Sequence, residues 1–407
     1  MAEKRICIFW SSLTFIQPSH YPGLFDQVKK ICEVKPSIEL VDVGLFSFEE
    51  IRAKAGSCDL VVIDHSIKFC YAIAKNKTNF NFLLRVHHKK EPAFYLEVFD
   101  YLFSIGHIPK ILMLNCDMHA LNSDVTGRFD GLGKDVFEKY ISKLQGIIWV
   151  YRAEDMKDVE ELPLAYRDPF MTIPDGYFPP RQNAMRIKQM VPSIIELPLC
   201  VDENEIHQGR RLAYWDVSVI GDGYQTRKIA KANIKAAKGV SLAPYFAANR
   251  IRNKITQLLY KSGIAGADKA TRFNYFSSHW VQDHILKHSR MSFTCGSGYM
   301  YFVRKFFEIP ASGSVLLGYT PGFAADYGFI HEQNYLFSTP EEAVSNIRFL
   351  KNNPLLRKEI RKKGLALIGE KHTSRKRAEQ FIYAIEEFVK TPFKEARFCS
   401  GNYTITR

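Results

Sequence analysis

A glutamate in the last third of the chain, Glu308, stands in a segment whose residue types suit the binding of a polar ligand. The segment RKFFEIPASGSVLLGYTPG joins an aromatic pair, the acid, a turn of small residues and an apolar run. A carboxylate accepts hydrogen bonds from both hydroxyl groups of a ribose, and Ser312 and Gly313 allow a backbone to pass close to a ligand. The ordinary alternative is a solvated acid at a helix end, since charged residues are rarely buried without a partner.

The same region holds groups suited to the phosphates of a nucleotide. The turn formed by Thr320, Pro321 and Gly322 stands before an apparent helix, where free backbone N–H groups favour a diphosphate. Basic side chains would neutralise the charge of that diphosphate. The candidates are Arg227, Arg304 and Lys305. Together these groups suit a nucleotide sugar.

Strands and helices in alternation must position these residues. In the first half, apolar runs such as RICIFW and DLVVIDH alternate with amphipathic stretches such as FSFEEIRAKAG, a pattern typical of a parallel sheet covered by helices. The proline-rich stretch around 163–211 indicates a linker, and strand-like runs return at DVSVIG, MSFTC, VLL and NYLF. We therefore predict an α/β fold with two Rossmann-like domains, 1–205 and 206–390, that face each other across a cleft, followed by a tail at 391–407.

Several motifs of the second half, in their order and spacing, resemble those of the CgeB-like glycosyltransferases. This family belongs to the two-Rossmann (GT-B) glycosyltransferase superfamily. The resemblance covers 216–389, and its motifs are DVSVIG, the TPG turn and YLF followed by TPEEA. The single residues that match are Arg227, Arg304, Phe307, Glu308, Ala311, Gly313, His372, Thr373 and Arg377.

The resemblance implies that the second domain binds the donor nucleotide and that the first lies on the acceptor side. Glu308 would contact the ribose, and the turn at Thr320, Pro321 and Gly322 would receive the diphosphate. The other residues implied in donor binding are Arg227, Arg304, Lys305, Gly313 and His372. Thr373 is also a good N-cap for the helix that follows it. Many retaining members carry a second Glu eight residues earlier, where this chain has Met300, so the resemblance leaves the stereochemistry open.

Candidates for the general base come from strand ends of the first domain. Asp64 and His65 close DLVVIDH, while Asp117 and His119 follow ILMLNC. A carboxylate or an imidazole at a strand end suits proton abstraction from an acceptor hydroxyl, and the alternative for each residue is capping or loop hydrogen bonding. The chain shows no compact acidic cluster of the kind that holds a metal ion, so we expect no metal and no cofactor other than the sugar donor.

The overall charge bears on the partners. The formal net charge is +13 and the pI is near 9.2, with dense basic stretches at 84–90, 228–261 and 355–364. Such a charge attracts anionic ligands, anionic membrane surfaces and nucleic acid. Eight cysteines stand without a C-x-x-C pair and are typical of free thiols. No long apolar run or leader-like start stands out, and we expect a cytoplasmic protein, with a peripheral position on the inner membrane face as the alternative.

Three functions follow from these observations. The first is transfer of a sugar from a nucleoside diphosphate to a glycan, lipid-linked or protein acceptor. The second uses the positive charge, since some phage enzymes of this architecture glycosylate modified DNA bases. The third is a nucleotide-binding module that has kept the fold without the chemistry.

Overall fold

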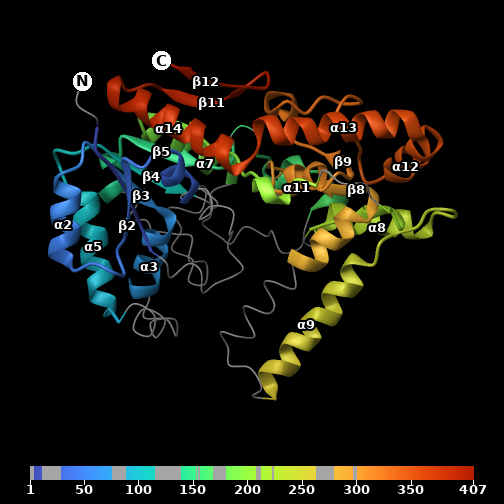
Figure 1. The fold of residues 1–407 in the computed structure, drawn as a ribbon, viewed down its shortest axis with the longest axis horizontal. Helices are drawn as coiled ribbons and strands as arrows, with labels where there is room; N and C mark the ends of the chain where they lie inside the picture. The colour runs from blue at the N-terminus through green and yellow to red at the C-terminus, as the bar shows by residue number, and fades with distance from the viewer. Residues whose placement is uncertain are drawn as a thin grey trace.

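The computed structural model describes residues 4–11, 29–75, 89–114, 139–152, 154, 156–167, 180–207, 212–221, 224–262, 279–296 and 300–407. Within these ranges the chain forms two sheets of parallel strands, one in each of two lobes that lie side by side (Figure 1). Helices cover both sheets. The predicted α/β fold with two Rossmann-like sheets is therefore confirmed.

The first lobe is built on a sheet with the strand order β12-β11-β6-β5-β4-β3-β1-β2 among the described residues. All neighbouring strands are parallel except β11 and β12, which form an antiparallel hairpin. The strands are β1 (Ile6–Trp10), β2 (Ile38–Asp42), β3 (Leu60–Asp64), β4 (Lys110–Leu114), β5 (Gly146–Trp149), β6 (Ser193–Glu196), β11 (Glu395–Cys399) and β12 (Asn402–Thr406). The helices of this lobe are α2 (Phe48–Gly56), α3 (His65–Lys75), α5 (Pro92–Ser104), α7 (Pro180–Met190) and α14 (Ser374–Lys390).

The alternation of apolar side chains along these strands explains how both faces of the first sheet are covered. Successive strand residues point to opposite faces, so Cys7 and Phe9 pack with α2, α3 and α5, whereas Ile6 and Ile8 pack with α14. Strands that are apolar on both faces are characteristic of a buried parallel sheet. The strands of the first lobe therefore appear in the sequence as unbroken apolar runs, because both of their faces are buried.

The second lobe contains a shorter sheet with the order β10-β9-β8-β7, all parallel. Its strands are β7 (Trp215–Val219), β8 (Ser289–Cys295), β9 (Val315–Tyr319) and β10 (Leu336–Phe337). Its helices are α8 (Gln225–Ala236), α9 (Tyr245–Lys261), a helix at 279–287, α11 (Lys305–Ala311), α12 (Ala343–Asn352) and α13 (Pro354–Lys371). The apolar faces of α8 and α12 pack on one side of this sheet. Just before α12, the backbone N–H of Thr339 donates to Oε2 of Glu342 at 3.1 Å and the backbone N–H of Glu342 donates to Oγ1 of Thr339 at 3.3 Å.

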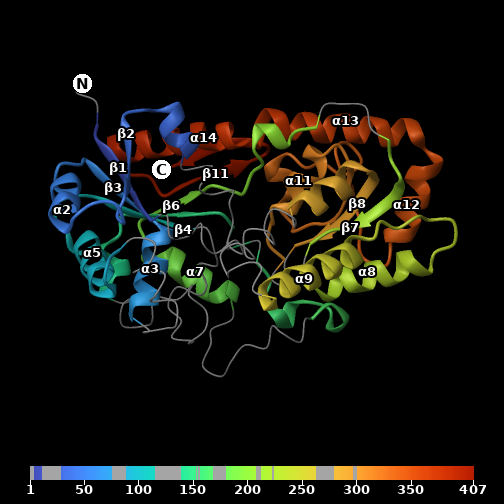
Figure 2. The ribbon, with the colours of Figure 1, turned by 60° about the horizontal axis from the view of Figure 1, so that its bottom comes forward.

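The C-terminal segment returns to the first lobe. Figures 1 and 2 show α13 on the second lobe and α14, the next helix in the chain, on the first. The buried face of α14, which includes Phe381 and Ile385, packs on the first sheet, and β11 pairs with β6. The sequence-based division placed this helix with the second domain and the tail apart. The amphipathic pattern of α14 predicts that one of its faces is buried. The pattern does not identify which of the two sheets that face packs on.

A buried ion cluster ties the two lobes together. Arg152, which follows β5, pairs with Glu196 at the end of β6, with 3.0 Å between Nε and Oε2. The same guanidinium reaches Asp326 of the second lobe, with 2.6 Å between Nη1 and Oδ2, and donates to the carbonyl oxygen of Phe398 at 2.7 Å. Tyr327 donates its hydroxyl to Glu196 at 2.5 Å. We refer to Arg152, Glu196, Asp326 and Tyr327 as the interlobe cluster.

Candidate functional site

The segment around Glu308 forms a short helix followed by a tight turn, as its sequence predicts. Glu308 lies in the first turn of α11, and the helix ends near Ser312. Gly313 follows with φ of 74°, a conformation that favours glycine. The chain then enters β9, whose residues Leu316 and Leu317 are fully buried. The short turn thus sets the position of α11, which carries Glu308, relative to the start of β9.

The carboxylate of Glu308 is held by three side chains and is only 7% exposed. Lys305 and Gln282 donate to Oε2 at 2.7 and 2.9 Å. Arg304 lies farther away, with 3.4 Å between its Nε and Oε1. An ionised carboxylate oxygen has lone pairs for two donors. Oε1 can therefore accept a hydrogen bond from a ligand in addition to its contact with Arg304.

Glu308 stays ionised despite its burial. Burial alone would raise its pKa, but the positive charges of Lys305 and Arg304 and the hydrogen bond from Lys305 outweigh this effect and hold the pKa at about 2. A carboxylate that is charged at neutral pH acts only as a hydrogen-bond acceptor. The site therefore favours a ligand that brings hydroxyl groups to Glu308.

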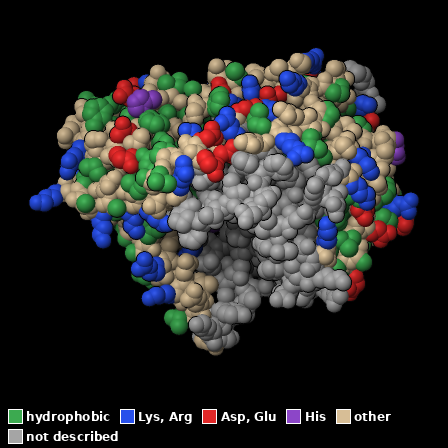
Figure 3. All heavy atoms as spheres, turned by 180° about the vertical axis from the view of Figure 1, so that it is seen from behind, with side chains coloured by type: hydrophobic (Ala, Val, Ile, Leu, Met, Phe, Trp, Pro, Cys, Tyr) green, Lys and Arg blue, Asp and Glu red, His purple; other side chains and the backbone are tan. Residues whose placement is uncertain are grey.

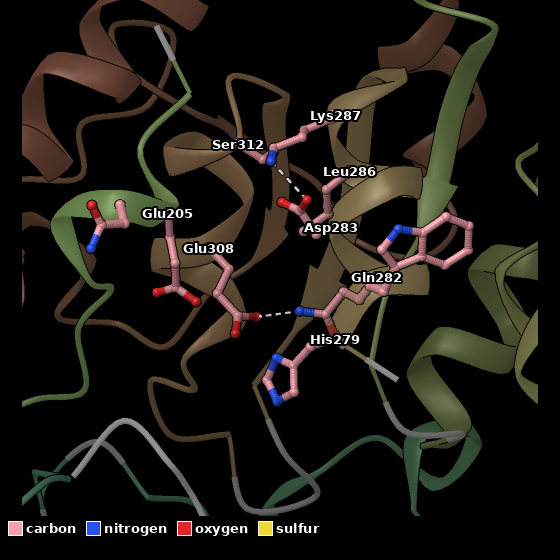
Figure 4. Close-up of a pocket in the computed structure, with 10 residues that line it drawn as sticks. Glu205, His279, Gln282, Asp283, Leu286, Lys287, Glu308 and Ser312 are labelled. Atoms are coloured by element: carbon pink, nitrogen blue, oxygen red, sulfur yellow. Dashed lines mark hydrogen bonds and ion pairs between the residues drawn. The ribbon is translucent and has the colours of Figure 1, made fainter. Parts of the chain in front are cut away.

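A cavity of about 320 Å³ opens beside this carboxylate. Figure 4 shows Glu308 between Glu205 on one side and Gln282 and His279 on the other. The lining residues are Asn204, Glu205, His279, Trp280, Gln282, Asp283, Leu286, Lys287, Glu308 and Ser312. The volume lies near the lower end of the range of small-molecule sites, roughly 300–1,000 Å³, so the cavity suits one part of a nucleotide.

Arg304 connects this cavity to the segment between the lobes. Its guanidinium donates to both carboxylate oxygens of Glu205, at 2.8 and 2.7 Å, and its Nε donates to the carbonyl oxygen of Cys200 at 3.1 Å. Arg304 thus bridges Glu205 and Glu308. Because Nη2 contacts Glu205 and Nε contacts Cys200, Arg304 ties the cavity to the connecting segment.

The structure places Arg227 in the buried layer beneath the turn after β7. Its side chain is 2% exposed and donates from Nη2 to the carbonyl oxygen of Cys295 at 2.9 Å. A Cβ at Gly221 would lie 2.6 Å from Nη1, so the turn needs glycine to accommodate the guanidinium. This position suits an electrostatic effect on the turn more than a contact at an open surface.

The turn at Thr320, Pro321 and Gly322 differs from the predicted helix start. It leads into a single 3-10 turn, Ala324–Tyr327, in place of an α-helix, so it lacks a long helix dipole. Thr320 is buried, and its hydroxyl oxygen lies 3.3 Å from that of Tyr335. Gly322 is open, since a Cβ there would meet no atom within 4 Å.

His372 and Arg377 lie at the point where the chain crosses back to the first lobe. His372 is fully buried between Phe307, Phe329 and Phe398. Its Nδ1 lies 2.8 Å from Nη2 of Arg377, and its Nε2 lies 2.7 Å from the carbonyl oxygen of Tyr327. An arginine only donates, so Nδ1 accepts and Nε2 carries the proton. Burial, assisted by the charge of Arg377, lowers the pKa of His372 well below its ordinary value.

The crossing continues at Thr373, which caps the next helix as predicted. Its side chain accepts from the backbone N–H of Lys376 at 3.3 Å. The backbone N–H of Ser374 donates to the carbonyl oxygen of Val201 at 2.8 Å. His372 and Thr373 therefore position the polypeptide between the lobes.

The strand-end candidates of the first lobe have different outcomes. Asp64 is buried at the end of β3, where Oδ1 accepts from the backbone N–H of Ser66 at 2.9 Å and from its hydroxyl, which is the capping arrangement. Burial raises the pKa of Asp64. His65 is the buried first residue of α3. Asp117 and His119 lie outside the described residues.

Most lining residues of the cavity were missed in the sequence, among them His279, Gln282 and Glu205. His279 and Gln282 stand three positions apart and share one face of the helix 279–287, and Glu205 belongs to the short 3-10 turn Glu203–Glu205 of the connecting segment. The helical spacing was a signal for the first two residues. Nothing in the sequence indicates that their face turns toward α11. Among the described residues, no group of three or more His, Cys, Asp or Glu side chains is placed to hold a metal ion.

Comparison with protein families places part of this region in a known class. Residues 266–383, less than half of the chain, match the family model described as glycosyl transferase-like. This match includes the helix 279–287, α11, β9 and the crossing at His372. This segment is therefore similar to glycosyltransferase domains. No curated protein is similar to the chain in sequence.

Solved structures are similar over nearly the whole chain, at very low identity. The structure of Anabaena Alr3699/HepE in complex with UDP-glucose is 9% identical, with 95% of this chain and 100% of that chain covered and a TM-score of 0.49. Sucrose-phosphate synthase of Thermosynechococcus elongatus is 10% identical, with 95% and 100% covered and a TM-score of 0.48. The pneumococcal O-GlcNAc transferase GtfA, in complex with UDP and GlcNAc, is 10% identical, with 74% and 61% covered and a TM-score of 0.42.

Proposed function

We propose that the protein is a glycosyltransferase that takes its sugar from a nucleoside diphosphate. The observation that carries this proposal is the ionised carboxylate of Glu308, which faces a cavity lined mainly by the glycosyltransferase-like segment. Its acceptor is a glycan, a lipid-linked sugar or a protein. The resemblance to the CgeB-like family belongs to the same proposal.

The donor nucleoside occupies the cavity beside Glu308 in this proposal. Its ribose hydroxyls donate to Oε1 of Glu308, and Trp280, which is 67% exposed at the rim, offers an aromatic face to the base. The open backbone at Gly322 lies toward the diphosphate. Gly313 allows the tight turn that positions α11, while Arg304 and Lys305 supply the positive charge beside Glu308.

Arg227 and His372 act by position in this account. Arg227 brings a buried positive charge beneath the turn after β7, and His372 fixes the segment that joins the lobes. For the acceptor side we keep Asp117 and His119 as the proposed general bases. Asp64 and His65 support the end of β3, where Asp64 is already engaged as a cap. We propose that no metal is required, and turnover should be unchanged by a chelator.

A thermal-shift screen tests the proposal. The panel contains UDP-glucose, UDP-GlcNAc and representative GDP-, CMP- and dTDP-sugars. A ligand at one hundred times its Kd stabilises the native state by about 2.7 kcal/mol, so one member should raise the Tm clearly. The matched control is Glu359→Gln, because Glu359 lies outside the cavity lining and forms an exposed pair with Lys363 at 2.8 Å. Glu308→Gln should reduce the shift strongly and Glu359→Gln should preserve it. The absence of a shift with every sugar nucleotide would contradict the proposal.

A further inference from the structure

The segment 224–262 has an unusual charge composition that donor binding does not explain. It contains nine Lys and Arg residues and no Asp or Glu. It forms α8, α9 and their connection, and Arg227 is its one cation among the predicted donor-binding residues. The other cations lie on α8 and α9, except Lys238 in the connection.

The helix α9 exposes a stripe of aliphatic side chains. Ile251, Ile255 and Leu258 are 60%, 43% and 66% exposed. They stand at i, i+4 and i+7, so they share one face of the helix. Figure 1 shows α9 projecting away from the body of the second lobe. We refer to these three residues as the aliphatic stripe.

Positive side chains accompany the stripe and gather at the base of α9. Arg250 and Lys254 are exposed on α9 itself. Lys231 of α8 lies over the ring of Phe246, with Nζ 4.1 Å from its centroid, and its pKa is lowered by burial and by the nearby charges of Arg250 and Lys235. Figure 3 shows Lys and Arg side chains along the arm at the lower left of that view. Cations are therefore crowded here without neutralising acids from the segment itself.

We propose that α9 docks the protein on an anionic lipid surface. The aliphatic stripe enters the boundary between headgroups and acyl chains, while Arg250, Lys254 and the cations of α8 lie against acidic headgroups. An exposed apolar stripe beside cations is typical of helices that lie in this interface. A nucleic acid would match the cations but offers no apolar phase for the stripe. Among the described helices, none is long and apolar enough to span a bilayer.

This interaction surface is separate from the donor cavity, so the inference does not depend on the proposed function. The residues of the stripe and the lining residues of the cavity have no member in common. The expected result of docking is that the protein acts at the membrane surface.

Vesicle sedimentation with the full chain tests the inference. The probes are vesicles of phosphatidylcholine alone and vesicles with 30 mol% phosphatidylglycerol, at low and at physiological salt. The stripe variant is Ile251→Ser with Leu258→Ser, and the charge variant is Arg250→Gln with Lys254→Gln. The matched control is Leu45→Ser with Leu355→Ser, which removes two leucines that are 75% and 83% exposed on other surfaces. Circular dichroism and the Tm report whether each variant folds.

The wild type should bind the anionic vesicles, and binding should weaken as salt is added. The stripe variant should bind on the order of tenfold less tightly or weaker. The charge variant should lose about fivefold for each cation removed, and the control should bind like the wild type.

Three outcomes would overturn the inference. The first is no binding of the wild type to anionic vesicles at low salt. The second is equal binding by the folded stripe variant and the wild type. The third is salt-sensitive binding to duplex DNA that is tighter than vesicle binding and unchanged in the stripe variant, which would assign this surface to nucleic acid.

Discussion

Two buried glutamates, each paired with an arginine, show how differently the chain uses the same chemistry. Glu308 faces a cavity and has a pKa held at about 2, because two positive side chains outweigh the effect of burial. Glu196 lies in the interlobe cluster, where burial raises its pKa and the charge of Arg152 does not cancel that effect. The Glu196 and Arg152 side chains are only 3% and 2% exposed, and their partners come from both lobes. We infer that the first site serves ligand binding and the second serves stability.

The largest expected effect comes from breaking the interlobe cluster. Arg152→Met leaves Glu196 and Asp326 without their partner, and removal of one member of a buried pair costs about 3–5 kcal/mol. Urea denaturation measures this loss. The matched control is Arg181→Met, since Arg181 forms a surface pair with Glu161 in which both side chains are more than 40% exposed. The control should cost less than about 1 kcal/mol. Equal losses in the two variants would remove the distinction between the sites.

The pH dependence of stability should have opposite signs at the two glutamates. The pKa of Glu308 falls from its ordinary 4.5 to about 2 on folding. Its ionised form therefore stabilises the fold above about pH 4.5, and this contribution, at most about 3 kcal/mol, is lost as the pH falls toward 2. For Glu196 the pKa is raised, so protonation favours the folded state as the pH falls. Denaturation of the wild type, Glu308→Gln and Glu196→Gln between pH 7 and pH 3 measures both effects.

At each pH, the quantity to compare is the free energy of unfolding of the wild type minus that of each glutamine variant. The advantage of the wild type over Glu308→Gln should shrink as the pH falls. As the pH falls, the stability of the wild type relative to Glu196→Gln should rise. The same sign at both sites would contradict the electrostatic account.

For donor binding, unlike stability, substitution of Glu308 should have a larger effect than substitution of Glu196. Glu308→Gln removes a charged acceptor, and a hydrogen bond to a charged group contributes about 1.5–3 kcal/mol. The Kd for the best sugar nucleotide should therefore rise roughly tenfold to a hundredfold by calorimetry. Glu196→Gln should leave that Kd within about threefold, provided that the variant is folded at the temperature used. A larger effect at Glu196 would place the ligand elsewhere.

The smallest expected effects come from adding a Cβ to two glycines, one with free space around it and one packed against backbone. A Cβ at Gly322 meets no atom within 4 Å, whereas a Cβ at Gly364 in α13 would lie 2.7 Å from the carbonyl oxygen of Asn334. Gly364→Ala should destabilise by about 1–3 kcal/mol because the helix must shift. Gly322→Ala should change stability by less than about 0.5 kcal/mol. Thermal unfolding measures both variants, and an equal loss at Gly322 would show that this turn is packed.

The sequence predicted those features that depend on local pattern. Apolar runs gave the strands of both sheets, and the small residues after Glu308 indicated the turn in which Gly313 has a positive φ. Thr373 was a recognisable N-cap. Each of these features depends on residues only a few positions apart.

Features that depend on distant residues could not be predicted in this way. Arg152 and Asp326 are 174 positions apart, and neither stands in a distinctive motif. The return of α14 depends on which of two apolar sheets has an uncovered face. Gln282 reaches Glu308 only because the helix 279–287 packs against α11. A lone Glu or Gln gives no sign of its partner.

The central claim is that Glu308 accepts hydrogen bonds from the donor ribose. A double-mutant cycle tests it directly, with wild type and Glu308→Gln on the protein side and a ribonucleotide sugar such as UDP-glucose and its 2′-deoxyribose analogue on the ligand side. Calorimetry gives the four Kd values, with the best-binding ribonucleotide sugar of the panel as the reference. We predict that removal of the 2′-hydroxyl weakens binding to the wild type about tenfold and binding to Glu308→Gln by less than about twofold. An equal loss in both proteins would contradict the claim.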